Sequence, residues 1–190
     1  ILDDKKFPTG YANGGFEKHP EKSKLYLGER HMDIMGPCRS GAVLVENFIP
    51  SDGRLLGILA VPKPDGQTLA VRGSDILDLT DTMENGFVYF DLPEGAYRLF
   101  ILFTTRTGGG RDHYMNLIDS SSVKVLLDEV YEKHYARYSK YFGNVIAGFF
   151  SDEPELGNVK GYPFDNMLGQ KDIRLPWSDE LERKLTETWK

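Results

Sequence analysis

The stretch "YRLFILFTTR", residues 97–106, is the starting point for predicting the fold. Its centre, "LFILF", is continuously apolar, as is typical of a strand covered on both faces of a parallel sheet. A helical pattern at 120–142 and a second apolar run at 145–150 follow it, and together they predict a βαβ unit with parallel strands. We therefore expect an α/β fold for this part of the chain.

Two helices are expected in the second half of the sequence. The helix at 120–142 has apolar residues at helical spacing, Asp119 as its N-cap and Gly143 just beyond its end. The tail "LPWSDELERKLTETWK" predicts the start of another helix. Ser178 and Asp179 both fit as its N-cap, and only Asp179 would complete a capping box with Glu182.

Residues 40–106 show a different pattern, with period-two alternation interrupted by turn residues. Turn chemistry at 50–53, 64–66, 84–86 and 93–95 predicts tight connections. The strands predicted between them are "SGAVLVENF", "GRLLGILAVP", "QTLAVRG", "GFVYFDLP" and "YRLFILFTTR". Short strands joined in this way indicate an antiparallel β unit. Residues 16–38 favour no element, apart from a short helix after His19 and Pro20.

Composition excludes several classes of partner. The net charge of -6 and the absence of a Lys/Arg cluster argue against nucleic acid. No apolar run approaches the ~20 residues of a membrane-spanning helix. The single Cys38 excludes an internal disulfide and a cysteine metal cluster. We expect no cofactor, and the His and Asp residues do not have zinc spacing.

The stretch "VIAGFFSDEPELGN", residues 145–158, carries the candidate chemistry. Asp152 and Glu153 follow the apolar run, and Pro154 comes next. A partly desolvated carboxyl group at a strand end can have a raised pKa and act as a general acid. We assign this role to Glu153 and substrate binding to Asp152. The alternative interpretation is a helix-entry turn with solvated acids.

Two other segments supply candidate contacts for a ligand. Asp3 and Asp4 follow the apolar pair at 1–2, which looks like the end of another strand. The loop "TRTGGGRDHY", residues 105–114, could bring Arg111 or His113 to a polar ligand, although a plain flexible loop fits the pattern somewhat better. It is not a phosphate loop, because the Lys-Ser/Thr ending of that motif is missing.

Four motifs in this order resemble a known family: "FPTGYANGG", "LPEGAYRLFILFTTR", "YMNLIDSSSVKVLLDEVYEKHYARYSKYFGNVIAGFFSDEP" and "LPWSDEL". They are similar to the barrel domain of bacterial glycoside hydrolases related to the α-L-rhamnosidases. The resemblance implies a (β/α)₈ barrel in which Glu153 is the general acid. Many such enzymes have Asn before this Glu, whereas this chain has Asp152.

The resemblance predicts a domain organisation and a set of partners. About three parallel barrel strands would lie in 1–39 and 96–190, and 40–95 would be a β-rich insertion. The chain would then be a segment of a larger enzyme, inactive alone, whose partners are the rest of the barrel and a carbohydrate. A soluble protein is expected, secreted, periplasmic or cytoplasmic. The alternative functions are a carbohydrate-binding or interaction module, or a scaffold.

Overall fold

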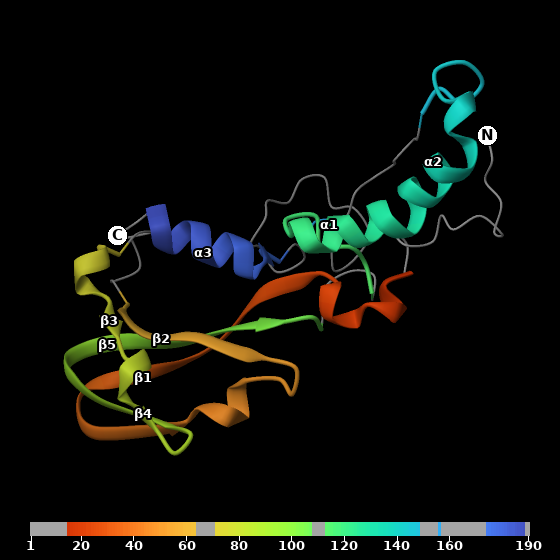
Figure 1. Ribbon diagram of the computed structural model, residues 1–190. Coiled ribbons are helices and arrows are strands. Elements are labelled where there is room, and N and C mark those ends of the chain that lie inside the picture. The colour runs from red at the N-terminus through yellow and green to blue at the C-terminus, as the bar shows by residue number, and fades with distance from the viewer. Residues whose placement is uncertain (1–14, 64–70, 108–112, 149–155, 157–173, 189–190) are drawn as a thin grey trace. The chain divides into compact units, whose positions relative to one another are not determined.

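The computed structural model describes residues 15–63, 71–107, 113–148, 156 and 174–188. The chain divides into two compact units, Ile1–Tyr26 with Arg106–Lys190 (unit 1) and Leu27–Thr105 (unit 2). The described strands form a predominantly antiparallel sheet in the order β3-β2-β5-β1-β6, with β4 paired to β5 (Figure 1). The predicted partial (β/α)₈ barrel of parallel strands is therefore wrong.

Unit 2 contains most of this sheet. Its strands are β1 (Leu25–Leu44, which starts in unit 1), β2 (Arg54–Pro62), β3 (Leu77–Asp78), β4 (Met83–Glu84) and β5 (Phe87–Thr105). Short 3₁₀ turns occupy Val45–Phe48, Gly73–Asp75 and Thr80–Thr82. β2 runs antiparallel to β5, with Cα partners from Arg54↔Thr104 to Pro62↔Tyr97. The antiparallel pairing predicted for this unit is confirmed, and β1 adds a long strand over residues left largely unassigned. The strand predicted at "QTLAVRG" is absent from its described part, 71–73.

Strand β5 corrects the interpretation of the apolar stretch at 97–106. Leu99 and Ile101 are fully buried, whereas Phe100 and Leu102 remain partly exposed. The strand pairs along its second half with β2, although β3 and β4 lie between the two strands in the chain. It is antiparallel and therefore does not begin a βαβ unit. The residues predicted as a turn at 93–95 lie within this one strand. The alternation of buried and exposed residues is interrupted there, at Gly95 with φ of +139°.

The core of unit 2 lies on one face of these strands. Every second residue of β5 on either side of the break enters it, together with residues from β2 and the connecting segments. The buried members are Val45, Ile58, Ala60, Leu79, Val88, Phe90, Leu92, Tyr97, Leu99, Ile101 and Phe103. Cys38, the free cysteine, packs against this core. Burying a large apolar side chain contributes roughly 1.5–3 kcal/mol, so this row dominates the stability of the unit.

Two glycines of β1 allow phenylalanine rings of β5 to lie directly on the backbone. A Cβ placed on Gly28 would be 2.3 Å from Phe103, and one on Gly41 would be 2.3 Å from Phe90. These separations are far inside van der Waals contact, so a side chain at either position would force the facing phenylalanine ring to shift. The two glycines thus fix where β5 packs against β1.

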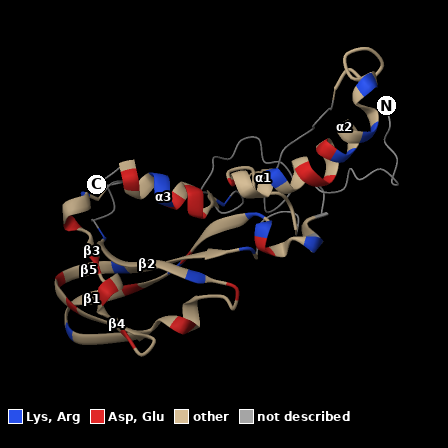
Figure 2. Cartoon of the chain, viewed as in Figure 1, with Lys and Arg blue, Asp and Glu red and all other residues tan. Residues whose placement is uncertain are grey.

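Unit 1 contains the helices, of which the first is composite. It is built from α1 (Ser120–Leu126), a π-helical turn (Leu127–Tyr131), α2 (Glu132–Tyr138) and a 3₁₀ turn (Ser139–Tyr141). Asp119 caps it, accepting a hydrogen bond at 2.9 Å from the Ser121 N–H. Figure 2 shows both acidic and basic residues along α1 and α2. The helix predicted at 120–142 and its N-cap are confirmed.

The second helix, α3 (Asp179–Thr188), settles the choice of its N-cap. The Ser178 hydroxyl accepts a hydrogen bond from the Leu181 N–H at 3.0 Å and donates one to the Ile118 carbonyl at 2.9 Å. Ser178 is therefore the N-cap. It is preceded by β6 (Pro176–Trp177), which pairs antiparallel with the start of β1 through Leu25↔Trp177.

Unit 1 has a small core of its own. Its buried apolar residues are Phe16, Tyr114, Met115 and Val130. Two 3₁₀ turns, Gly15–Lys18 and Pro20–Lys22, lead into β1. The second begins at Pro20, where the sequence predicted a short helix. The fully buried Ser122 accepts a hydrogen bond at 2.9 Å from the Asn116 N–H, which ties α1 to the segment before it.

Candidate functional site

The structure describes one of the six candidate site residues. His113 is exposed and has a φ of +53°, at the junction before the buried Tyr114. Five candidates lie outside the described residues, namely Asp3, Asp4, Arg111, Asp152 and Glu153.

The segment that leads to Glu153 differs from the prediction of a buried strand at 145–150. In its described part, 145–148, there is no strand, and Val145 is 77% exposed. The chain turns here, because the Ile146 N–H donates to the Tyr141 carbonyl at 2.8 Å and the Gly143 N–H donates to the Ile146 carbonyl at 3.1 Å. Gly143, with φ of +83°, permits this turn. Phe142 and Ile146 form only an isolated bridge, so the strand prediction is wrong over these residues.

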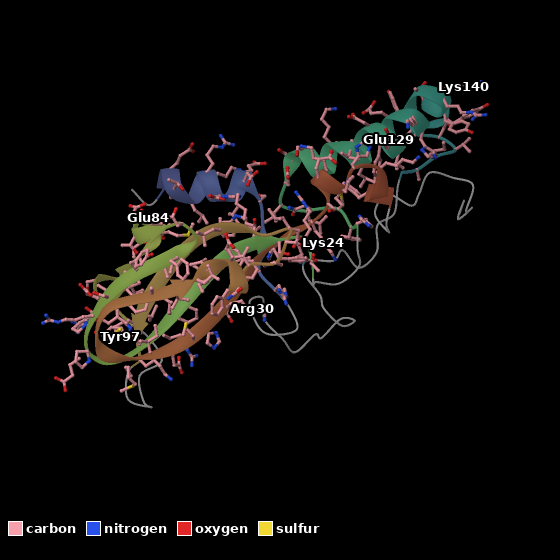
Figure 3. All side chains as sticks on the ribbon, turned by 90° about the horizontal axis from the view of Figure 1, so that it is seen from below. Lys24, Arg30, Glu84, Tyr97, Glu129 and Lys140 are labelled. Carbon is pink, nitrogen blue, oxygen red and sulfur yellow. The ribbon has the colours of Figure 1, made fainter. Side chains whose placement is uncertain are left out.

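A buried lysine is the most unusual polar residue of unit 1. Lys24 is only 5% exposed, and its Nζ lies 5.5 Å from the ring centroid of Tyr26 and 5.4 Å from that of Tyr114. Figure 3 labels it near the start of β1. An ammonium group over aromatic rings is stabilised by their quadrupoles. Sequence analysis did not predict this cluster, because Lys24 and Tyr26 lie in the unassigned stretch and Tyr114 is far away in the chain.

A second cation lies against the same stretch of backbone. Arg106 donates from Nη2 to the Glu21 carbonyl at 2.6 Å and from Nη1 to the Ser23 carbonyl. These bonds hold the segment before β1 next to the residue that follows β5. Lys24, Arg106 and the two tyrosines therefore form a defined cluster in unit 1. The charged groups of Lys24 and Arg106 are N–H donors, which bind oxygen acceptors.

Unit 2 has a charged cluster that ties strands together. Arg98 donates to both carboxylate oxygens of Asp33, from Nε at 2.7 Å and from Nη2 at 3.0 Å, and Lys63 donates to the same group at 2.6 Å. The hydrogen bonds from Arg98 and then Lys63 hold the pKa of Asp33 well below its usual range. A carboxylate held by two cations is a poor proton donor, so we interpret this cluster as structural.

An exposed aromatic pair lies elsewhere on unit 2. Phe87 and Tyr89 are two residues apart on β5, with ring centroids 6.3 Å apart and ring planes inclined by 35°. They are 36% and 44% exposed, whereas the intervening Val88 is fully buried. The sequence "FVYFD" alternates between two apolar faces, and the alternation alone does not say which face is buried.

Carboxylates flank this pair at both ends. Glu84 on β4 is the direct partner of Phe87, and Asp91 is two residues beyond Tyr89. Glu84 is labelled in Figure 3. Within the described part of the chain, its carboxylate has no hydrogen-bond or ion-pair partner. Asp91 accepts a hydrogen bond from the Ser40 N–H at 2.6 Å. We call Phe87, Tyr89, Glu84 and Asp91 the aromatic–acid face.

Comparison with protein-family models, curated proteins and solved structures finds no match. The resemblance to glycoside hydrolases therefore stays a prediction. Among the described residues no group of His, Cys, Asp and Glu is arranged to hold a metal ion. In the same residues no helix is long and apolar enough to cross a membrane.

Proposed function

We propose that this chain is part of a glycoside hydrolase acting on O-glycosidic bonds of an oligosaccharide or polysaccharide. The observation that carries the proposal is the sequence at 151–154, in which Asp152 and Glu153 stand between an apolar run and Pro154. The order of the surrounding motifs supports it through the family resemblance. The proposal does not depend on a barrel, which the fold contradicts.

Glu153 is the general acid in this proposal. Its protonated carboxyl group would give a proton to the glycosidic oxygen as the bond to the sugar breaks. A second carboxylate must either attack the sugar or activate water, at about 5–5.5 Å or ~6.5–9.5 Å from the first, respectively. Asp152, Asp3, Asp4, Arg111 and His113 are the proposed contacts to the sugar.

The test compares the complete wild-type enzyme with its Glu153→Gln variant on two kinds of substrate. Oligosaccharides have a poor leaving group that needs protonation, so turnover should fall by about 10²–10⁴-fold. A 2,4-dinitrophenyl glycoside has a leaving group that needs no proton, so the first chemical step should be much less affected. Glu155→Gln, two residues further along the chain, is the matched control and should retain activity. Equal activity of wild type and Glu153→Gln on oligosaccharides would contradict the proposal.

The second candidate function is a carbohydrate-binding or interaction module without catalysis. The exposed pair of Phe87 and Tyr89 favours it, because sugar-binding surfaces commonly present aromatic rings to solvent. The variant Glu153→Gln separates the two candidate functions. If the chain is only a binding module, glycan binding should be unaffected by this substitution. If it is part of a glycoside hydrolase, hydrolysis should be lost.

A further inference from the structure

The two rings of the aromatic–acid face are adjacent and accessible at once. Phe87 and Tyr89 point away from the core on the same side of β5, since residues i and i+2 of a strand share a face. The Thr82 hydroxyl donates to the Tyr89 carbonyl at 2.7 Å and fixes the backbone of this strand. Exposed apolar residues are ordinary when scattered singly, but two neighbouring rings make a small continuous apolar surface.

The hairpin that carries this surface is rigidly specified. Asn85 and Gly86 have φ of +51° and +82°, the conformation of a tight two-residue turn between β4 and β5. The Val45 N–H donates to the Gly86 carbonyl at 2.9 Å, which anchors the turn to the segment after β1. The rings are thus held on a sheet rather than on a loose loop.

Three carboxylates lie close to the rings or to the turn beside them. Glu84 and Asp91 flank the pair, and the Glu46 carboxylate lies near Gly86, where an added Cβ would be 3.2 Å from its Oε1. Carboxylates are acceptors only, so they suit a ligand that offers hydroxyl donors. The same charges disfavour a ligand that is itself anionic.

A neutral pyranose matches both properties of the surface. One face of the sugar ring presents C–H groups, which pack on the negative face of an aromatic ring. The hydroxyl groups at its edge donate to carboxylates, and bonds to an ionised acceptor are the stronger kind. A uronic acid offers the same C–H face but adds a carboxylate that the acidic rim would repel.

We propose that the aromatic–acid face binds a neutral pyranosyl chain, with Phe87 and Tyr89 as stacking platforms and Glu84 and Asp91 as hydroxyl acceptors. The ligand class rests on the proposed function, whereas the site is separate from Glu153. The face therefore acts as an accessory binding surface that holds a glycan chain. It discriminates against acidic glycans through charge.

The experiment measures binding to the 190-residue chain by isothermal titration calorimetry. Cellohexaose, xylohexaose and mannohexaose are the neutral probes, and hexagalacturonate is the acidic probe. We expect saturable binding of at least one neutral probe and at least tenfold weaker binding of hexagalacturonate. Phe87→Ala with Tyr89→Ala should abolish binding, and Glu84→Gln should weaken it several-fold. Tyr141→Ala, which removes a comparably exposed ring (40%) from unit 1, is the matched control and should bind as wild type.

Each other outcome overturns the inference. The inference is wrong if wild type binds none of the three neutral probes. It is also wrong if the variant that lacks both rings still binds. Thermal unfolding of the double variant within about 2 °C of wild type shows that the fold is intact, and Glu84→Gln provides a second test that leaves both rings in place. If sedimentation velocity shows that the rings instead mediate self-association, the face is a protein interface. The hydrolysis test of Glu153→Gln in the complete enzyme separates the two proposals. If Glu153→Gln loses turnover but the chain binds no neutral probe, only this inference is refuted.

Discussion

Unit 2 and the composite helix of unit 1 are stabilised in different ways. In unit 2, strands β1, β2 and β5 bring residues far apart in the chain into one buried row, in which Ile58, Leu99 and Ile101 are fully inaccessible. Along the composite helix, Val130 is buried but Leu127 and Tyr135 are 42% and 55% exposed. Much of what holds that helix is local, namely its cap and ion pairs four residues apart.

The comparison teaches where a substitution should matter most. A residue in the long-range core of unit 2 supports several strands at once, so its loss should affect the whole unit. A residue that makes only local contacts supports about one helical turn. The following predictions probe this contrast, from the largest expected effect to the smallest.

Truncating the centre of the unit 2 core should have the largest effect. Ile101→Ala removes a fully buried side chain and should lower the free energy of unfolding by about 2–5 kcal/mol. Urea denaturation measures the loss, and hydrogen exchange with mass spectrometry locates it. Protection should fall throughout β2 and β5 and stay close to wild type at 120–138. A uniform loss in both units would show that they unfold together.

Adding one methyl group at Gly41 should have the next largest effect. Gly41→Ala places a Cβ on the ring of Phe90 and should cost about 1–3 kcal/mol through overpacking. Replacing Phe90 with Leu in the same variant should recover part of that loss. Gly73→Ala is the control, because nothing lies within 4 Å of its added Cβ. If Gly41→Ala is as stable as Gly73→Ala, the close packing of β5 on β1 is incorrect.

Removing the N-cap of the composite helix should have a smaller and more local effect. Asp119→Ala deletes the acceptor for the Ser121 N–H and should cost ~1 kcal/mol. Hydrogen exchange should increase in α1 and remain unchanged in unit 2. Asp128→Ala, which breaks only the exposed pair with Lys124, should cost no more than ~0.5 kcal/mol. If Asp119→Ala and Asp128→Ala lower the free energy of unfolding equally, the N-cap does not stabilise the helix as proposed.

The smallest effect is a pH dependence at the start of α3. Hydrogen bonds from Lys184 and Ser120 lower the pKa of Glu180 from 4.5 to about 2. Because the folded state favours the ionised form, its stabilising contribution is complete above pH 4.5 and is lost as the pH falls through 2. Glu180→Gln should therefore melt slightly below wild type at pH 7, and the difference should shrink progressively below pH 4.5.

A pH series of melting temperatures checks this prediction, with Glu187→Gln on the same helix as control. The control should follow wild type over the whole range. A difference between Glu180→Gln and wild type that is the same at pH 7 and pH 2.5 would contradict the proposed ionic contribution.

Local features were the part of the fold that sequence predicted correctly. The cap at Asp119, the turn at Asn85 and Gly86, and strand β2 each follow from short-range chemistry, because the residues that decide them are neighbours in the chain. For the N-cap of α3, the sequence leaves two candidates, Ser178 and Asp179. In the folded chain the N-cap is Ser178, whose hydroxyl accepts from the Leu181 N–H and also donates to the Ile118 carbonyl.

Strand partners and buried faces were decided by the tertiary structure. The apolar run at 97–106 fits a parallel or an antiparallel strand equally well, and only its pairing with β2 made it antiparallel. Alternation in "FVYFD" identifies two faces, but the packing of Val88 and Phe90 into the core left Phe87 and Tyr89 exposed. Lys24 became notable only when folding brought Tyr114 beside it. The physical reason is common to all three, since pairing and burial depend on contacts between residues distant in sequence, whereas caps and turns depend on adjacent ones.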